Sequence, residues 1–177
     1  VPKDPIYTEY YKKYFSDSEV EQFIETSGVR TRYITGEKQT ASDLCYVAAK
    51  KIMEHKGYTG DDIDACIFIT QMPDYAMPAT AFVLHKRLEL KENCVVFDIN
   101  LGCSAFPNGV SIVSSMIKSG LINRGLLLIG DSHSYCFKDE EKLSHDNMLF
   151  GDCGSACIIE NITKNNQEEN DCVINSI

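Results

Sequence analysis

The chain alternates short apolar runs with stretches in which apolar residues recur at helical spacing. Apolar runs of strand length lie at residues 65–70, 94–99, 125–130, 155–159 and 172–177. Helical periodicity covers residues 17–27, 41–56, 79–88 and 104–118. Strands that are apolar throughout are buried on both faces, as in parallel sheets covered by helices. The pattern therefore predicts an α/β fold with a mostly parallel sheet.

The ends of two helices carry recognisable signals. Asp17 or Ser18 is expected to cap the helix 17–27, and Gly28 to end it. Gly57 is expected to end the helix 41–56. The apolar positions predicted to form the buried face of that second helix are Leu44, Val47, Ala48 and Ile52.

The charge balance excludes two classes of partner. The 177 residues include 17 basic and 26 acidic side chains, for a net charge of -9. A nucleic-acid binder needs a basic face to neutralise phosphates, and docking on an anionic membrane has the same need. The uncharged stretch 99–117 contains Asn, Gly, Pro and Ser, too polar for a membrane span. No apolar signal segment precedes the first helix, so we expect a cytoplasmic protein.

The eight cysteines do not form a paired framework. Without an export signal we expect reduced thiols. The absence of a C-x-x-C motif argues against a thiol-redox protein, and Cys153 and Cys157 lack a second ligand pair for zinc. No metal site is therefore expected. The cysteines expected in the core are Cys66, Cys94, Cys153 and Cys157.

Cys103 differs from the other cysteines because it follows a strand by a tight turn, residues 100–102, and lies where a helix begins. The positive end of a helix stabilises a thiolate, and free N–H groups there can bind an oxyanion. Gly102 is expected to permit the sharp turn. Cys103 is thus a candidate nucleophile, with a buried structural cysteine as the equal alternative.

The histidines give weaker signals. His133 and His145 flank the loop after strand 125–130, at the edge where open parallel sheets bind ligands, so either is a candidate to lie near Cys103. His55 and His85 are expected to be solvated on helix surfaces.

Six segments together resemble the N-terminal half of beta-ketoacyl-acyl carrier protein synthase III, a thiolase-like condensing enzyme. They are SGVRTRYI (27–34), SDLCYVAAKKIME (42–54), DIDACIFITQMPDYAMPATA (62–81), FDINLGCSAFPNGV (97–110), IKSGLINRGLLLIGD (117–131) and FGDCGSACII (150–159). The resemblance implies a thiolase-like fold, of which residues 1–159 form the first of two similar halves with a mostly parallel five-stranded sheet. Residues 160–177 would lead into the second half.

The resemblance implies an activity for Cys103. It would accept an acyl group as a thioester, and a malonyl group on acyl carrier protein would lose carbon dioxide and attack that thioester. The substrates would be acyl thioesters of coenzyme A or of acyl carrier protein, with no separate cofactor. The family also implies a homodimer with strand 94–99 at the interface.

The resemblance also implies pocket residues. Met77 falls where the family places an apolar residue that reaches across the dimer into the partner's acyl tunnel, and Phe150 matches a residue near the nucleophile. By a rougher alignment, Gln71 and Ser134 line the same pocket. The alternative for Met77 and Phe150 is an ordinary core position.

The sequence departs from the family pattern in two respects. The family's catalytic His and Asn lie in its second half, so neither role is assigned here. Three positions that contact coenzyme A in the well-studied bacterial type hold Gln22, Thr26 and Ser144. A carrier protein or another thioester is therefore favoured over acetyl-coenzyme A as the acyl donor.

Two other functions are compatible with this resemblance. An enzyme of the same fold could transfer the acyl group to an alcohol or amine without decarboxylation. A non-catalytic subunit could support an active partner, although a scaffold has no need of a nucleophile at Cys103.

Overall fold

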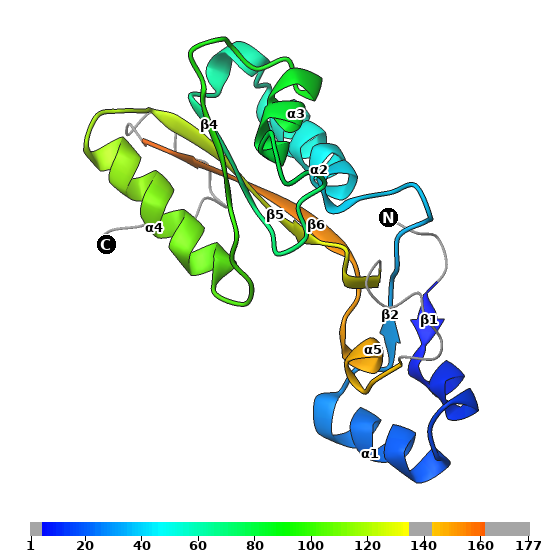
Figure 1. Ribbon diagram of the computed structural model, residues 1–177. Helices are drawn as coiled ribbons and strands as arrows, with labels where there is room; N and C mark the ends of the chain where they lie inside the picture. The colour runs from blue at the N-terminus through cyan, green and yellow to red at the C-terminus, as the bar shows by residue number, and fades with distance from the viewer. Residues whose placement is uncertain (1–4, 135–142, 162–177) are drawn as a thin grey trace.

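The computed structural model describes residues 5–134 and 143–161 (Figure 1). The strand expected at 172–177 and most of the connector 160–177 lie outside these ranges. None of the helices in the described ranges combines the length and the apolar character that a membrane crossing requires.

The centre of the molecule is a four-stranded sheet in the order β4-β3-β5-β6. Strands β3 (Ala65–Ile69), β4 (Val95–Ile99) and β5 (Arg124–Asp131) are parallel, and β6 (Cys153–Glu160) runs antiparallel to β5. The predicted α/β class and mostly parallel sheet are confirmed. Four of the five expected strands are present in the described part of the chain, and the remaining one falls outside it.

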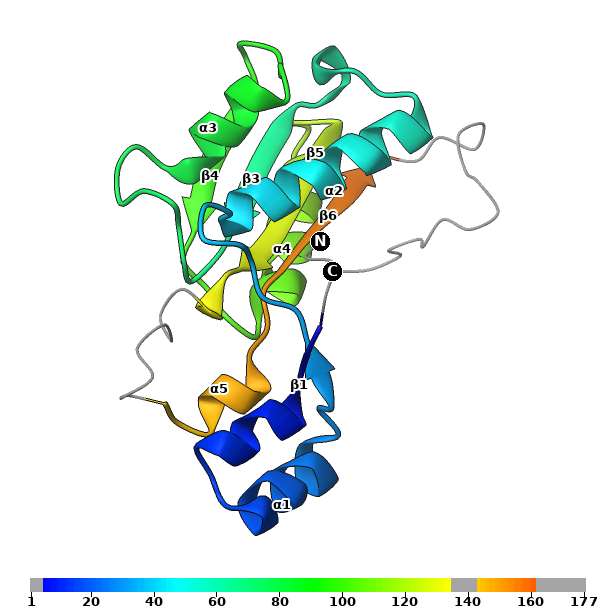
Figure 2. The same cartoon turned by 90° about the vertical axis from the view of Figure 1, so that its right-hand side faces the viewer.

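Helices cover both faces of the sheet (Figures 1 and 2). Helices α2 (Ala41–Lys56) and α3 (Thr80–Arg87) pack on one face, and α4 (Ala105–Lys118) packs on the other. The short 3₁₀ helix η2 (Gly60–Asp62) precedes β3. Because β3 contributes alternate residues to both cores, all five of its residues are buried, as its unbroken apolar run predicts.

Helix α2 has the predicted ends but buries a different face. Leu44 is buried as predicted, whereas Val47 is 46% exposed, and Ala48 and Ile52 are half-buried. The buried positions are Ala41, Ser42, Leu44, Cys45, Ala49 and Met53. The reason lies in the tertiary packing. The start of α2 packs on Gly130 of β5 and Gly154 of β6, so the Leu44–Cys45 side of the helix faces the sheet.

A smaller lobe lies beyond one end of the sheet (Figures 1 and 2). Its elements are β1 (Ile6–Tyr7), the 3₁₀ helix η1 (Thr8–Lys13), α1 (Asp17–Ser27), β2 (Thr31–Arg32) and α5 (Asp146–Leu149). Tyr11, Val20, Ile24 and Met148 form its core. Gly28 ends α1 in the left-handed conformation as predicted, but the N-cap is Ser16. Its hydroxyl accepts from the Glu19 amide, so the prediction of Asp17 or Ser18 is wrong.

Helix α4 approaches the sheet closely enough to fix the segment before it. A Cβ at Gly109 would lie 2.7 Å from a methyl group of Leu127, and one at Gly125 would lie 2.5 Å from Val113. These close approaches hold the axis of α4 over β5. The first turn of α4 therefore lies at the end of the sheet where β3 and β5 finish.

Candidate active site

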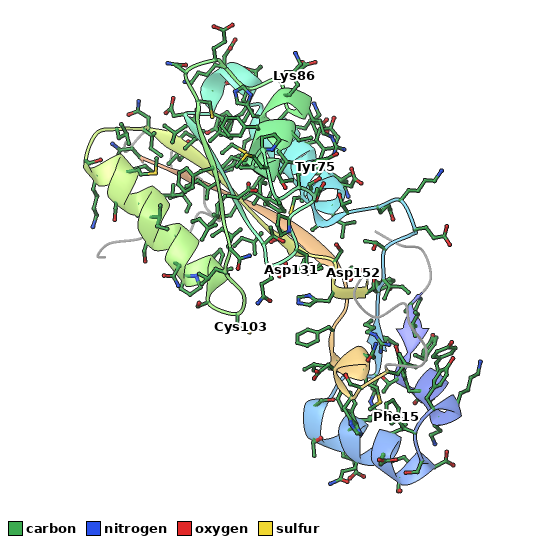
Figure 3. The ribbon with its side chains drawn as sticks, viewed as in Figure 1. Phe15, Tyr75, Lys86, Cys103, Asp131 and Asp152 are labelled. Carbon is green, nitrogen blue, oxygen red and sulfur yellow. The ribbon has the colours of Figure 1, made fainter. Side chains whose placement is uncertain are left out.

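Cys103 lies in the turn that connects β4 to α4, immediately before the helix N-cap Ser104. The Ala105 amide donates to the Gly102 carbonyl at 2.8 Å, which closes the turn. The Cys103 side chain is exposed, and Figure 3 shows it at the tip of this turn. The alternative of a buried structural cysteine is therefore wrong for this chain, and Cys103 is open to solvent.

Gly102 serves a purpose that its sequence position does not reveal. Its backbone is not left-handed, so the turn does not itself require glycine. A Cβ at residue 102 would instead lie 2.8 Å from Cδ and Nε2 of Gln71. The absence of a side chain at Gly102 leaves room for the side-chain carboxamide of Gln71. This predicted pocket residue therefore lies directly beside the Cys103 turn.

Asp131 holds the loop that carries Gln71. It ends β5, and its Oδ1 accepts from the Thr70 hydroxyl at 2.8 Å, from the Gln71 amide at 2.7 Å and from the Met72 amide at 3.2 Å. Asp131 is not among the site residues predicted from the sequence. The available signal was a carboxylate directly after an apolar strand of a parallel sheet, at the edge where ligands bind.

Phe150 stacks on His133, with ring centroids 4.7 Å apart and an interplanar angle of 17°. Phe150 is 36% exposed, so the ring is only partly covered. The ring of His145 instead lies 4.8 Å from that of Phe15, and its Nε2 is 3.9 Å from Glu19 on α1. His133 thus packs on a predicted pocket residue, while His145 belongs to a contact within the small lobe, between the start of α5 and α1.

Ser134 takes part in a network around the buried carboxylate of Asp152. The Ser134 hydroxyl donates to Asp152 Oδ2 and its amide donates to Oδ1 at 2.9 Å. The Thr35 amide and hydroxyl donate to Oδ2 at 2.6 and 2.7 Å. Asp152 therefore ties the segment after β2 to the segment after β5, a role the sequence analysis missed within FGDCGS.

Met77 is 88% exposed, so the core alternative is wrong for this residue. Its loop, residues 71–78, is anchored on both sides. Asp74 accepts from the hydroxyls of Thr40 and Ser42 at the start of α2. Asp98 of β4 accepts from the first amides of α3, those of Thr80 and Ala81, at 2.6 and 2.7 Å. The loop is thus held at its base while residues 75–78 stay exposed.

The remaining described thiols divide by burial. Cys66 is buried, and Cys94 and Cys157 are half-buried. Cys153 is exposed, against the prediction of a core position, because it begins β6 at the outer edge of the described sheet. Burial raises the pKa of Cys66 well above its usual range, raises that of Cys45 to about 12 and raises that of Cys94 to about 11.

The two remaining histidines lie on helices, and two of the residues that depart from the family pattern contact each other within α1. His55 is exposed as expected, whereas His85 is half-buried and its Nε2 lies 3.0 Å from the Lys91 carbonyl. The Thr26 hydroxyl donates to the Gln22 carbonyl within α1. Within the described ranges, no three His, Cys, Asp or Glu side chains gather as metal ligands.

Comparisons with known proteins relate the chain to one family. A family model described as 3-oxoacyl-[acyl-carrier-protein] synthase III matches residues 97–176, which include the Cys103 turn. Beta-ketoacyl-[acyl-carrier-protein] synthase III of Chlamydia caviae is 33% identical over 156 residues, covering 84% of this chain and 46% of that protein. The enzyme of the same name from Helicobacter hepaticus is 38% identical over 144 residues, covering 81% of this chain and 42% of that protein.

The chain resembles the N-terminal half of beta-ketoacyl-[acyl-carrier-protein] synthase III. A crystal structure of the 3-oxoacyl-(acyl-carrier protein) synthase from Burkholderia xenovorans LB400 superposes with a TM-score of 0.85 at 35% identity, covering 92% of this chain and 46% of that one. The resemblance and the thiolase-like fold predicted from the sequence are confirmed. The chain spans less than half the length of these relatives, which are enzymes by name.

Proposed function

We propose that this chain is part of an acyl-transferring condensing enzyme in which Cys103 forms an acyl thioester. The observation that carries the proposal is the exposed thiol at the start of α4, in a chain that resembles beta-ketoacyl-acyl carrier protein synthase III. A thiolate is a strong nucleophile near neutral pH, and the thioester it forms remains electrophilic. The first property allows the acyl-enzyme to form, and the second allows it to be consumed in the next step.

The proposed reaction has two stages. The Cys103 thiolate attacks the carbonyl carbon of the donor thioester, and the donor's thiolate leaves and takes up a proton. A malonyl thioester on acyl carrier protein then loses carbon dioxide, and its carbanion attacks the acyl carbonyl and expels the Cys103 thiolate. Amides at the start of α4 are candidates to bind the oxyanion. The products serve fatty acid or polyketide synthesis.

The donor is proposed to be a carrier-protein thioester, not acetyl-coenzyme A. By the resemblance, Gln22, Thr26 and Ser144 of this chain fall at positions that contact coenzyme A in the well-studied bacterial type. The Thr26 hydroxyl is bonded to its own helix, and the Ser144 amide and hydroxyl face Asn147. None of the three supplies the aromatic ring or guanidinium that those positions hold in the bacterial type.

The active form is proposed to be a cytoplasmic homodimer. Strand β4 is paired on one side only within the described sheet, and all five of its residues are half-exposed. An edge strand of this kind is an available pairing surface. The exposed Met77 belongs to the loop that leads from β3 to α3, which packs on β4.

The deciding experiment is intact-mass analysis of the purified protein after incubation with acyl-coenzyme A and acyl carrier protein thioesters. We expect one acyl adduct in the unmodified protein and in Cys153→Ala, which removes the other exposed thiol among the described cysteines. Cys103→Ala should form no adduct. An adduct that persists in Cys103→Ala, or no adduct with any donor, overturns the proposal.

A second stage tests the condensation. Adding malonyl-acyl carrier protein to the acylated protein should release the adduct as a 3-oxoacyl product two carbons longer, together with carbon dioxide. Release only on addition of an alcohol or amine would assign the protein to the acyltransferases of the same fold.

A further inference from the structure

Carboxylates join the two central strands, β3 and β5, at both of their ends. At one end, Asp64 accepts from the Asn123 and Arg124 amides at 2.7 and 2.9 Å, where β5 begins. At the other end, Asp131 accepts from the Gln71 and Met72 amides, just after β3 finishes. Each carboxylate binds two successive backbone amides, and each has one further donor, Lys91 for Asp64 and the Thr70 hydroxyl for Asp131. Only the Asp131 end borders the Cys103 turn (Figure 3).

The contacts from Asp131 to the Cys103 turn are continuous. One carboxylate oxygen binds two successive amides and the Thr70 hydroxyl, which fixes the backbone at the point where Gln71 leaves it. The Gln71 side-chain carboxamide then packs against Gly102, 2.8 Å from the position that a Cβ would take. Gly102 is covalently bonded to Cys103, so a shift of the Gln71 loop changes the packing one residue from the thiol.

We infer that Asp131 is a positioning residue for the chemistry at Cys103, acting by holding Gln71 against Gly102. The kinetic part of this inference rests on the proposed function. Asp131 itself touches backbone amides and a hydroxyl, and it acts through the geometry of its neighbours. Small displacements of a nucleophile from its reactive geometry lower rates steeply.

Asp131→Ala and Asp64→Ala form a matched pair, since each removes a carboxylate that binds two amides between the same strands. We expect Asp131→Ala to slow acylation of Cys103 by about tenfold or more at saturating donor. Asp64→Ala should leave that rate near the unmodified value even where it lowers thermal stability. Asp131→Asn should recover much of the rate, because its Oδ1 still accepts hydrogen bonds.

Gln71→Ala and Gly102→Ala test the middle of the same chain of contacts. Gln71→Ala removes the amide group, and Gly102→Ala displaces it while leaving the bonds of Asp131 in place. Both should slow acylation in the same direction as Asp131→Ala. The double variant Asp131→Ala/Gln71→Ala should be no slower than Asp131→Ala alone, since residues that act through one another are not additive. These two variants decide the question if Asp131→Ala does not fold.

A second readout does not need the proposed function. The alkylation rate of Cys103 by iodoacetamide, followed by peptide mass, should change severalfold in Asp131→Ala, because the Gln71 carboxamide is no longer held against Gly102 beside the thiol. In Asp64→Ala it should stay near the unmodified value. This ratio decides the positioning role even if no thioester acylates Cys103. Equal effects of the two substitutions on both acylation and alkylation overturn the inference and leave the proposed function standing.

Discussion

The backbone of Gly154 in β6 packs directly against Leu44 of α2, with no room for a side chain at position 154. A Cβ at position 154 would lie 2.5 Å from the Leu44 Cβ and 2.6 Å from the Cys45 amide nitrogen. Gly154 pairs with Gly130 of β5, where a Cβ would lie 2.8 Å from the Cys45 Sγ. Two paired glycines thus form the surface on which the start of α2 rests.

We expect Gly154→Ala to destabilise the protein by about 1–3 kcal/mol, the usual cost of overpacking a tight contact. The atoms it would strike are backbone and Cβ atoms, which cannot rotate away. The midpoint and slope of urea unfolding measure the change. Gly36→Ala is the matched control, because its nearest neighbour would be Gln39 Oε1 at 3.6 Å. Equal midpoints for the two variants would contradict the close approach.

The same contact shows what the sequence could and could not predict. Periodicity located helix 41–56 and strands 65–70 and 125–130 to within one residue, because the spacing of apolar residues and the signals at helix ends are local properties of the sequence. It did not predict which side of α2 is buried, since that depends on two glycines on distant strands. The apolar run at residues 155–159 likewise does not indicate that β6 runs antiparallel to β5.

The candidate site divides in the same way. The exposed thiol of Cys103 at a strand-to-helix turn could be predicted, because strand, glycine and helix follow one another along the chain. The packing of the Gln71 side-chain carboxamide against Gly102 could not be predicted, because Gln71 comes from another segment of the chain. Asp131 and Asp152 also act on partners that are distant in sequence. Neither carboxylate lies in a local motif, such as a capping box, that would name its partners.

Ser16→Ala should destabilise the small lobe by about 1 kcal/mol, the typical value of an N-cap side chain. The substitution removes the hydroxyl that accepts from the Glu19 amide and breaks half of the capping box. Ser18→Ala is the control, because Ser18 lies inside the first turn and does not cap it. Thermal unfolding followed by circular dichroism should show the larger loss for Ser16→Ala. The opposite order would restore Ser18 as the cap.

The stability contributed by Asp64 should depend on pH. Burial opposes ionisation of this carboxyl, but hydrogen bonds from Lys91, Asn123 and Arg124 outweigh it and hold its pKa below the usual 3.8. A lowered pKa in the folded state gives stability that is present above about pH 4 and is lost as pH falls through the folded value. The stability advantage of the unmodified protein over Asp64→Asn should therefore shrink below pH 4.

Urea unfolding at several pH values between 7 and 3 measures this difference. Lys91→Met provides the companion variant, since it removes the ammonium group that donates to Asp64. It should weaken the acid dependence without abolishing it, because the two amide donors remain. A difference between the unmodified protein and Asp64→Asn that stays constant down to pH 3 would refute the assignment.

Thiol labelling should separate the described cysteines into two groups. Cys103 and Cys153 are exposed, so iodoacetamide at pH 8 should alkylate them in the folded protein. Cys45 and Cys66 should react only after unfolding, because burial both shields them and raises the pKa of Cys45 to about 12. Peptide mass after quenching assigns each site. Early labelling of Cys45 would show that α2 detaches readily from the sheet.

Met77→Lys tests the proposed homodimer. Met77 is 88% exposed in the single chain, so a lysine there should leave thermal unfolding of the protomer unchanged. In a dimer that buries this side chain the same lysine must lose its hydration, which destabilises the interface. Sedimentation velocity over a dilution series should therefore show weaker self-association. Leu121→Lys, at a 64% exposed apolar residue beyond the end of α4, should leave self-association unchanged. Equal association of the two variants would remove Met77 from the interface, because a residue at the contact cannot tolerate the charge as well as one outside it.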